Sequence, residues 1–231
     1  NPIYTSGMSA DDKYAAAKAA ALGFFQAAGY TVENGKITAA PEGAKMQYEV
    51  QIPADGTGNH PAFMMVTEAK KALAEIGMDI VVTDLSDATA LWDGIRARQV
   101  DMWCAAWSAT PDPDMYQVYY ADVADFNGDM GNGFNPQGGP DQGNSSYMYC
   151  VADEELDNMI MEARKSLDQS YRKTLYKACL DTIVDWATEV PVYQRQNAII
   201  FSTERVKMET VLPDITTFYG WLNGIENMEL N

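Results

Sequence analysis

The chain has 231 residues, with 33 Asp and Glu against 16 Lys and Arg, so its formal net charge is −17. An acidic chain without a cluster of basic residues argues against binding to a nucleic-acid backbone, and it disfavours binding to an anionic membrane surface. Hydrophobic residues make up 47% of the chain, and no stretch approaches the ~18 consecutive apolar residues of a membrane helix. Length and composition therefore predict a folded protein of one or two domains.

The chain opens at Asn1 and Pro2, without an initiator Met or a signal peptide. This start predicts either a processed mature protein or a segment of a longer one. Three cysteines, Cys104, Cys150 and Cys179, are an odd number and do not form a disulfide framework. One pair could bridge, and the sequence does not say which; we favour three small thiols, mostly buried.

Helical and strand patterns alternate in the first half of the chain. Ser9, with Asp12 three residues later, predicts a helix N-terminus, and Gly29 predicts its end. The following elements are expected, in order, to be a strand over Met46 to Ile52, a helix over Pro61 to Ile76, a strand over Met78 to Leu85, a helix over Ala88 to Gln99 and a strand over Asp101 to Trp107. This order predicts parallel strands joined by right-handed crossovers.

The second half opens with a long region rich in Gly, Asn, Asp and Pro, from Thr110 to Ser146. Loops of this length in a compact domain are usually functional. The remaining elements are expected to be a short helix over Met115 to Tyr120, helices over Asp153 to Leu167 and Ser170 to Thr188, a strand within Val190 to Ser202, and an irregular aromatic tail from Thr203 to Asn231.

Enzymatic chemistry has few candidate residues. His60 is the single histidine, which removes His-based zinc motifs, and we interpret it as a loop residue before a helix. One alternative stays open. Gly56 and Gly58 lie between a strand and a helix, with Asp84 near the end of the next strand, as in a dinucleotide-binding enzyme. Pro61 stands at the third glycine position, which disfavours this alternative.

Ligands of parallel α/β sheets bind beyond the carboxyl ends of the strands. The richest such loop is Trp107 to Asp114. Trp107 has two interpretations here, a ligand contact and a core aromatic packed under the loop, and the sequence does not separate them.

Short segments spread along the chain resemble the extracytoplasmic solute-binding proteins of peptide-type ABC transporters. This is the oligopeptide/dipeptide/nickel-binding family, bacterial solute-binding protein family 5. The matching segments, in order, are Ala27-Ala28-Gly29-Tyr30, Ile76-Gly77-Met78-Asp79-Ile80, Val100-Asp101-Met102, Ala106-Trp107 with Pro111-Asp112-Pro113-Asp114, Asn144 with Tyr147 and Glu155-Leu156-Asp157, Arg172-Lys173 with Tyr176, and Glu189-Val190-Pro191-Val192-Tyr193. Each piece is weak alone, but their order over Ala16 to Tyr193 is specific.

The resemblance implies a periplasmic-binding-protein-like lobe with a mixed, mainly parallel sheet flanked by helices. It implies solute capture rather than catalysis. From the residues themselves we expect no cofactor and no metal site. In peptide-binding members, the segment matching Ala106, Trp107, Ser108 and Ala109 lends main-chain hydrogen bonds to the ligand. Thr110 stands where those members have an aspartate that pairs with the amino terminus of the peptide. The implied ligand-binding residues are Ala106, Trp107, Ser108, Ala109, Thr110, Asp112 and Asn144.

The same resemblance implies the partners and the location. Family members are considerably longer, so we expect residues 1–202 to form a ligand-binding lobe and residues 203–231 to pack on an absent first lobe. The implied partners are a peptide or other small solute, the permease subunits of an ABC transporter and the missing N-terminal lobe, with no nucleic acid. The implied location is extracytoplasmic, periplasmic or at the cell surface, with a lipid anchor in the full-length protein.

Overall fold

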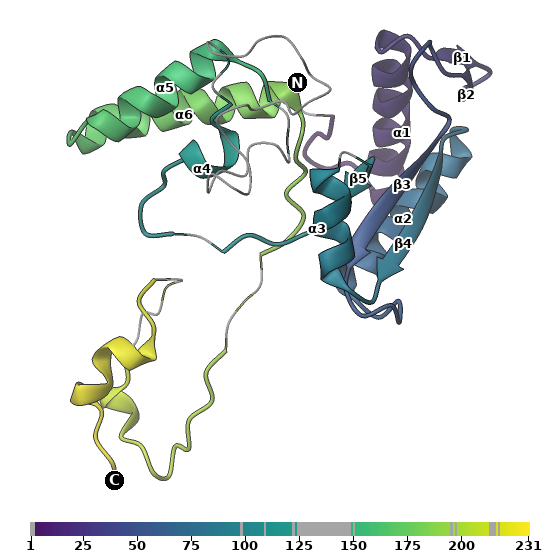
Figure 1. The fold of residues 1–231 in the computed structure, drawn as a ribbon. Helices are drawn as coiled ribbons and strands as arrows, with labels where there is room; N and C mark the ends of the chain where they lie inside the picture. The colour runs from purple at the N-terminus through teal and green to yellow at the C-terminus, as the bar shows by residue number, and fades with distance from the viewer. Residues whose placement is uncertain are drawn as a thin grey trace. The chain divides into compact units, whose positions relative to one another are not determined.

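The computed structural model describes residues 3–97, 99–108, 110–121, 123, 149, 151–194, 196, 198–212, 216 and 218–231. The chain divides into two compact units, Asn1–Ala106 and Trp107–Asn231, which Figure 1 colours from purple to yellow. Each unit has hydrophobic clusters of its own. In the part of the chain that the structure describes, no helix has the length and apolar character needed to cross a membrane.

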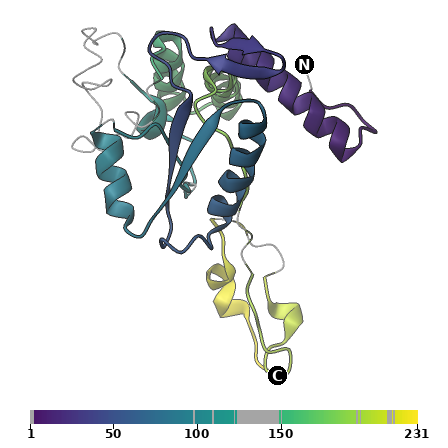
Figure 2. The same ribbon diagram turned by 90° about the vertical axis from the view of Figure 1, so that its right-hand side faces the viewer.

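A three-stranded parallel sheet forms the centre of the first unit. The strands lie in the order β4 (Asp79–Leu85), β3 (Gln47–Pro53), β5 (Met102–Trp103), and both neighbouring pairs are parallel. Helices α2 (Pro61–Glu75) and α3 (Ala88–Arg96) flank the strands, one on either side in Figure 2. The cluster between α2 and the sheet consists of Val50, Ile52, Ala62, Val66 and Ile80. The predicted parallel α/β arrangement is confirmed.

A helix and a hairpin precede this sheet. Helix α1 (Ala10–Ala27) begins at Ser9, whose Oγ accepts a hydrogen bond from the Asp12 N–H, so the predicted cap is confirmed. Strands β1 (Thr31–Glu33) and β2 (Lys36–Ala39) pair antiparallel across a two-residue turn. A second cluster, Tyr30, Ile37, Ile76 and Met78, joins this hairpin to the end of α2.

Strand β5 is much shorter than the expected Asp101 to Trp107. It pairs with β3 only at Met102 and Trp103, and the Cys104 N–H still donates to the Gln51 carbonyl. The next bond of a parallel ladder would need an N–H from Pro53, which proline lacks. The strand prediction was therefore right in place and wrong in length, because the proline on its partner ends the ladder.

Three helices organise the described part of the second unit: α4 (Tyr116–Tyr119), α5 (Glu154–Lys165) and α6 (Gln169–Trp186). Asp153 caps α5 and Asp168 caps α6 through backbone N–H groups of the first turn. The shared cluster of α5 and α6 contains Val151, Leu156, Ile160, Cys179 and Ile183. All three helices were predicted at these places.

The strand expected within Val190 to Ser202 is absent from the described residues of that segment. A strand requires a hydrogen-bonding neighbour, and no described strand pairs with this segment. Its apolar side chains are correspondingly exposed, with Ile200 94% exposed. The C-terminal segment then folds into two short 3-10 helices, η5 (Met208–Thr210) and η6 (Trp221–Asn227), with one bridge between Val206 and Leu230.

Candidate functional site

The loop that opens the second unit contains most of the predicted ligand-binding residues. Trp107, Ser108, Thr110 and Asp112 all line one pocket of about 600 Å³. Ala106 is the last residue of the first unit. Two predicted residues, Ala109 and Asn144, lie outside the described residues. The structure therefore gathers four of the seven predicted residues around one cavity of ligand size.

Trp107 is half-exposed at the pocket. Its side chain is 48% exposed, so the interpretation as a core aromatic does not hold for the described chain. Its Nε1–H donates to the Tyr149 Oη at 2.7 Å, which fixes the orientation of the indole. Trp107 is one of the residues that line the pocket, and ligand contact by Trp107 stays a prediction.

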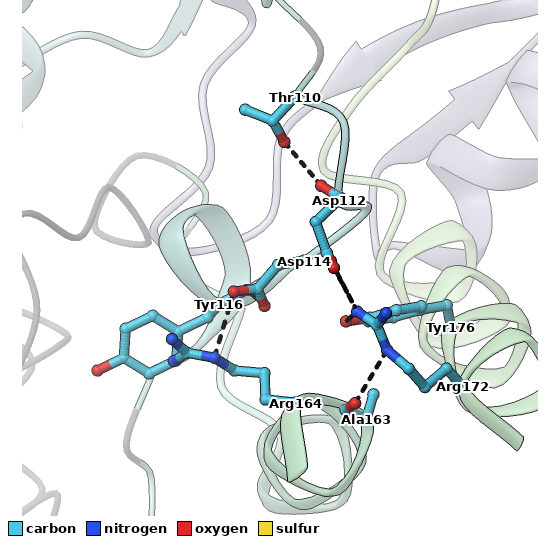
Figure 3. A network of polar contacts seen from close by, with 8 residues as sticks. All are labelled: Thr110, Asp112, Asp114, Tyr116, Ala163, Arg164, Arg172 and Tyr176. Atoms are coloured by element: carbon cyan, nitrogen blue, oxygen red, sulfur yellow. Dashed lines mark hydrogen bonds and ion pairs between the residues drawn. The ribbon is translucent and has the colours of Figure 1, made fainter. Parts of the chain in front are cut away.

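The rest of the loop is held by ion pairs to α5 and α6, as Figure 3 shows. Arg172 Nη2 donates to both carboxylate oxygens of Asp112, at 2.7 and 2.9 Å, and Arg172 Nε donates to the Ala163 carbonyl. The hydrogen bond to Asp112 raises the pKa of Arg172. The charge of Asp112 is thus engaged within the protein.

Asp114 anchors the other end of the loop. Its Oδ2 lies 3.2 Å from Arg164 Nε, and its Oδ1 accepts from the Tyr116 N–H at the start of α4. The Arg164 guanidinium also lies over the Tyr116 ring, 4.1 Å from the centroid (Figure 3). Two arginines therefore hold the Asp-Pro-Asp segment in place, which is a structural role.

Thr110 makes a local hydrogen bond. Its Oγ1 donates to the Asp112 carbonyl at 2.7 Å, which stabilises the turn that precedes the Asp112 ion pair. The hydroxyl of Thr110 is thus used within the loop, and it carries no charge to offer a ligand.

Sequence reasoning missed three residues beside this loop. Tyr119 Oη donates to Glu189 Oε2 at 2.6 Å, and Tyr149 Oη makes a longer contact with Glu189 Oε1 at 3.4 Å. The two tyrosine rings stack with centroids 5.4 Å apart. Burial raises the pKa of Tyr149 to about 12 and, with the hydrogen bond to Glu189, raises the pKa of Tyr119. Glu189 was noticed only as part of a family motif, and no local pattern joins residues so far apart.

The residues of the dinucleotide alternative serve the fold. The Gly58 N–H donates to Asp84 Oδ2 at 2.8 Å, closing the loop after β3. Asp84 Oδ1 is buried and accepts no hydrogen bond from any described residue. His60 caps α2, with its Nδ1 accepting from the Ala62 N–H, so its interpretation as a loop residue before a helix is confirmed. A dinucleotide would need this helix end and this carboxylate free; His60 caps the helix end, and one oxygen of the buried carboxylate is bonded within the loop.

Neither a metal cluster nor a disulfide is present among the residues that the structure describes. No group of three or more His, Cys, Asp or Glu side chains gathers there. Cys104 and Cys179 are free thiols, and burial raises the pKa of both, that of Cys179 to about 11. Cys150 lies outside the described residues.

No protein-family model matches the sequence, and no curated protein matches it. Solved structures do match. NikZ from Campylobacter jejuni, in complex with Ni(L-His), aligns with a TM-score of 0.52 and 19% identity, over 74% of this chain and 30% of its own. The chain has a periplasmic-binding-protein-like fold. The likeness confirms the predicted resemblance at the level of the fold.

Two further solved structures are similar but align less closely. NikA from Brucella suis, in complex with Fe(III)-EDTA, has a TM-score of 0.47 and 18% identity, over 81% of this chain and 33% of its own. The periplasmic murein tripeptide binding protein MppA, in an unliganded open form, has a TM-score of 0.48 and 16% identity, over 81% of this chain and 30% of its own. The chain spans about 30% of the length of the solved structures it matches.

Proposed function

We propose that this chain is one lobe of an extracytoplasmic solute-binding protein, which captures a peptide or similar small solute and delivers it to the permease of an ABC importer. The observation that carries the proposal is the pocket at the start of the second unit. It has ligand-sized volume, a half-exposed tryptophan at its wall and a lining loop fixed by two arginines. A rigid wall with an aromatic anchor is suited to binding a solute without transforming it.

The fold supports the same proposal. The chain aligns with 30% of the length of NikZ, which leaves room for a second lobe that closes over the ligand. We propose that residues 203–231, together with the exposed apolar side chains of Val190, Val192 and Ile200, contact that lobe. In this arrangement the ligand binds between the lobes, and lipid anchoring keeps the protein outside the membrane near its permease.

The experiment is native mass spectrometry of the full-length protein, purified without denaturation. We expect a bound mass corresponding to a peptide or a comparable small solute, and we expect peptides to raise the melting temperature of the ligand-free protein by mass action. The chain alone should bind the same solute more weakly, because it offers half of the binding surface. The proposal fails if the full-length protein carries no solute and no peptide shifts its melting temperature.

The dinucleotide-dependent enzyme remains as the alternative that this experiment addresses. Adding NAD to the full-length protein should leave the melting temperature unchanged, because Asp84 and the start of α2 are engaged within the fold. Stabilisation by NAD that is lost on Asp84→Asn would favour the enzyme. The Asp84→Asn control is matched, since the amide oxygen keeps the bond from Gly58.

A further inference from the structure

We propose that Glu189 and the rings of Trp107, Tyr119 and Tyr149 form a subsite for a cationic group of the bound solute, an alkylammonium or a guanidinium. These four residues are called the aromatic–carboxylate cluster. The inference rests on the proposed function, which it deepens by naming the chemistry that the solute presents. Its basis is the charges, the hydrogen bonds and the exposure of the cluster.

Among the described residues, the carboxylates at the pocket are unevenly paired with basic side chains. Asp112 pairs with Arg172 and Asp114 pairs with Arg164. Among the described residues, Glu189 pairs with no Lys, Arg or His, and it is exposed. Two carboxylates are thus paired within the fold, while the Glu189 carboxylate, beside the pocket, has no basic partner among the described residues. A positively charged group of the ligand would pair with the Glu189 carboxylate.

Hydrogen bonds hold this carboxylate at a fixed place. Each oxygen of Glu189 faces one tyrosine hydroxyl, Tyr119 at 2.6 Å and Tyr149 at 3.4 Å. A carboxylate has about four acceptor positions, so these contacts leave acceptor capacity for a donor from the ligand. Tyr119 itself lines the pocket, which places the carboxylate one hydrogen bond from the pocket wall.

Trp107 is tied to the same carboxylate through Tyr149. The indole N–H donates to the Tyr149 hydroxyl, which in turn contacts Glu189. With its N–H used in this way, Trp107 can meet a ligand through its aromatic ring but not through its donor. The negative face of an indole attracts a cation within about 6 Å of its centroid. The cluster therefore combines a fixed carboxylate with a half-exposed indole, which is the chemistry of ammonium and guanidinium recognition.

Glu189 also has a purely structural interpretation, as the acceptor that orders the two tyrosines. The two roles differ in what they require. A structural acceptor needs an oxygen, which a glutamine also provides, whereas cation recognition needs the negative charge. Glu189→Gln therefore separates them, with Glu155→Gln as the control, because Glu155 is an exposed glutamate of α5 outside the pocket lining.

The experiment is isothermal titration calorimetry on the full-length protein with two matched pairs of peptides. Trialanine and N-acetyl-trialanine differ in the charge of the amino terminus. N-acetyl-alanyl-lysyl-alanine amide and its norleucine analogue differ in the charge of the side chain. We expect the charged member of one pair to bind at least tenfold more tightly than the neutral member, as one charge-assisted hydrogen bond allows. The pair that shows the preference tells whether the cation comes from the peptide terminus or from a side chain.

We expect Glu189→Gln to abolish this preference, with unchanged circular dichroism, and Glu155→Gln to leave it intact. Equal binding of charged and neutral peptides, or a preference that survives Glu189→Gln, would overturn the subsite while leaving solute binding in place. Binding of no peptide at all, together with no solute in native mass spectrometry, would overturn both the subsite and the proposed function.

Discussion

Arg172 donates from one guanidinium nitrogen to both carboxylate oxygens of Asp112, which lies 60 residues earlier in the chain. Arg172 is the more enclosed partner, with a side chain 13% exposed against 57% for Asp112. The same guanidinium bonds the end of α5 through the Ala163 carbonyl. One arginine on α6 therefore positions both a neighbouring helix and the loop that lines the pocket.

We predict that Arg172→Leu lowers the melting temperature by about 3 °C or more, because it leaves the Ala163 carbonyl and the Asp112 carboxylate without this donor. Differential scanning calorimetry measures the shift. Lys173→Leu is the control, since Lys173 is the next residue of the same helix and is exposed. Equal shifts for the two variants would show that the Arg172 contacts do not stabilise the fold.

Gly77 lies where the end of α2 meets the β1–β2 hairpin. Its φ is +90°, and a Cβ at this position would overlap the Ile37 carbonyl oxygen. We predict that Gly77→Ala costs about 2–3 kcal/mol in the free energy of unfolding, through both backbone strain and this overlap. Denaturant unfolding followed by circular dichroism measures the cost.

Gly35→Ala is the matched control for Gly77. Gly35 has a φ of +73°, but a Cβ added there would meet no atom within 4 Å, so only the backbone cost of about 1 kcal/mol applies. The difference between the two variants measures the overlap with Ile37. A Gly77→Ala variant no less stable than Gly35→Ala would rule out the close approach.

Local signals made much of the fold predictable. Ser9 and Asp153 each cap the helix they were expected to begin, because a cap depends on residues within one turn. Local signals were not enough to predict the structure of Val190 to Ser202. Its apolar residues favour a strand, but a strand forms only when another strand pairs with it.

The candidate site was only half predictable for a similar reason. The loop from Trp107 to Asp114 follows directly from the rule that ligands bind at strand ends. Glu189 lies 70 residues after Tyr119 in the sequence, and the fold brings the two side chains into contact. The helix packing that does this is not encoded in any local sequence pattern. Asp112 was predicted to bind the ligand. Only the position of Arg172 in the structure shows that the Asp112 carboxylate is already paired.

Asp157 is a buried carboxylate that anchors the chain after α4. Its two oxygens accept from the Ala121 and Val123 N–H groups, both at 2.8 Å. We predict that Asp157→Ala costs about 2–4 kcal/mol, because two backbone donors lose a charged acceptor in a buried place. Denaturant unfolding measures the cost, and Glu155→Ala on the exposed side of α5 serves as control. Hydrogen exchange should also quicken at Ala121 and Val123; unchanged exchange there would contradict the assigned contacts.

Tyr30 predicts an alkaline loss of stability. Its hydrogen bond with Tyr48, followed by burial, raises its pKa to about 12 from the ordinary tyrosine value of 10.0. Between these values the unfolded tyrosine has lost its proton while the folded one keeps it, so the free energy of unfolding falls as pH rises from 10 to 12. Tyr30→Phe should make this fall less steep in denaturant titrations. The exposed Tyr4→Phe is the control, and an equally steep fall in Tyr30→Phe would contradict the prediction.

Trp107 provides the direct test of the pocket. We predict that Trp107→Ala in the full-length protein weakens binding of the solute found by native mass spectrometry by about tenfold or more, since a half-exposed indole at a pocket wall loses its contact area. Trp107→Phe should retain part of the affinity, because it keeps an aromatic face but not the N–H that bonds Tyr149. Calorimetric titration gives both dissociation constants, and Trp92→Phe, in helix α3 of the first unit, controls for loss of an indole elsewhere. Unchanged affinity in Trp107→Ala would show that Trp107 does not contact the ligand and that the ligand binds away from this loop.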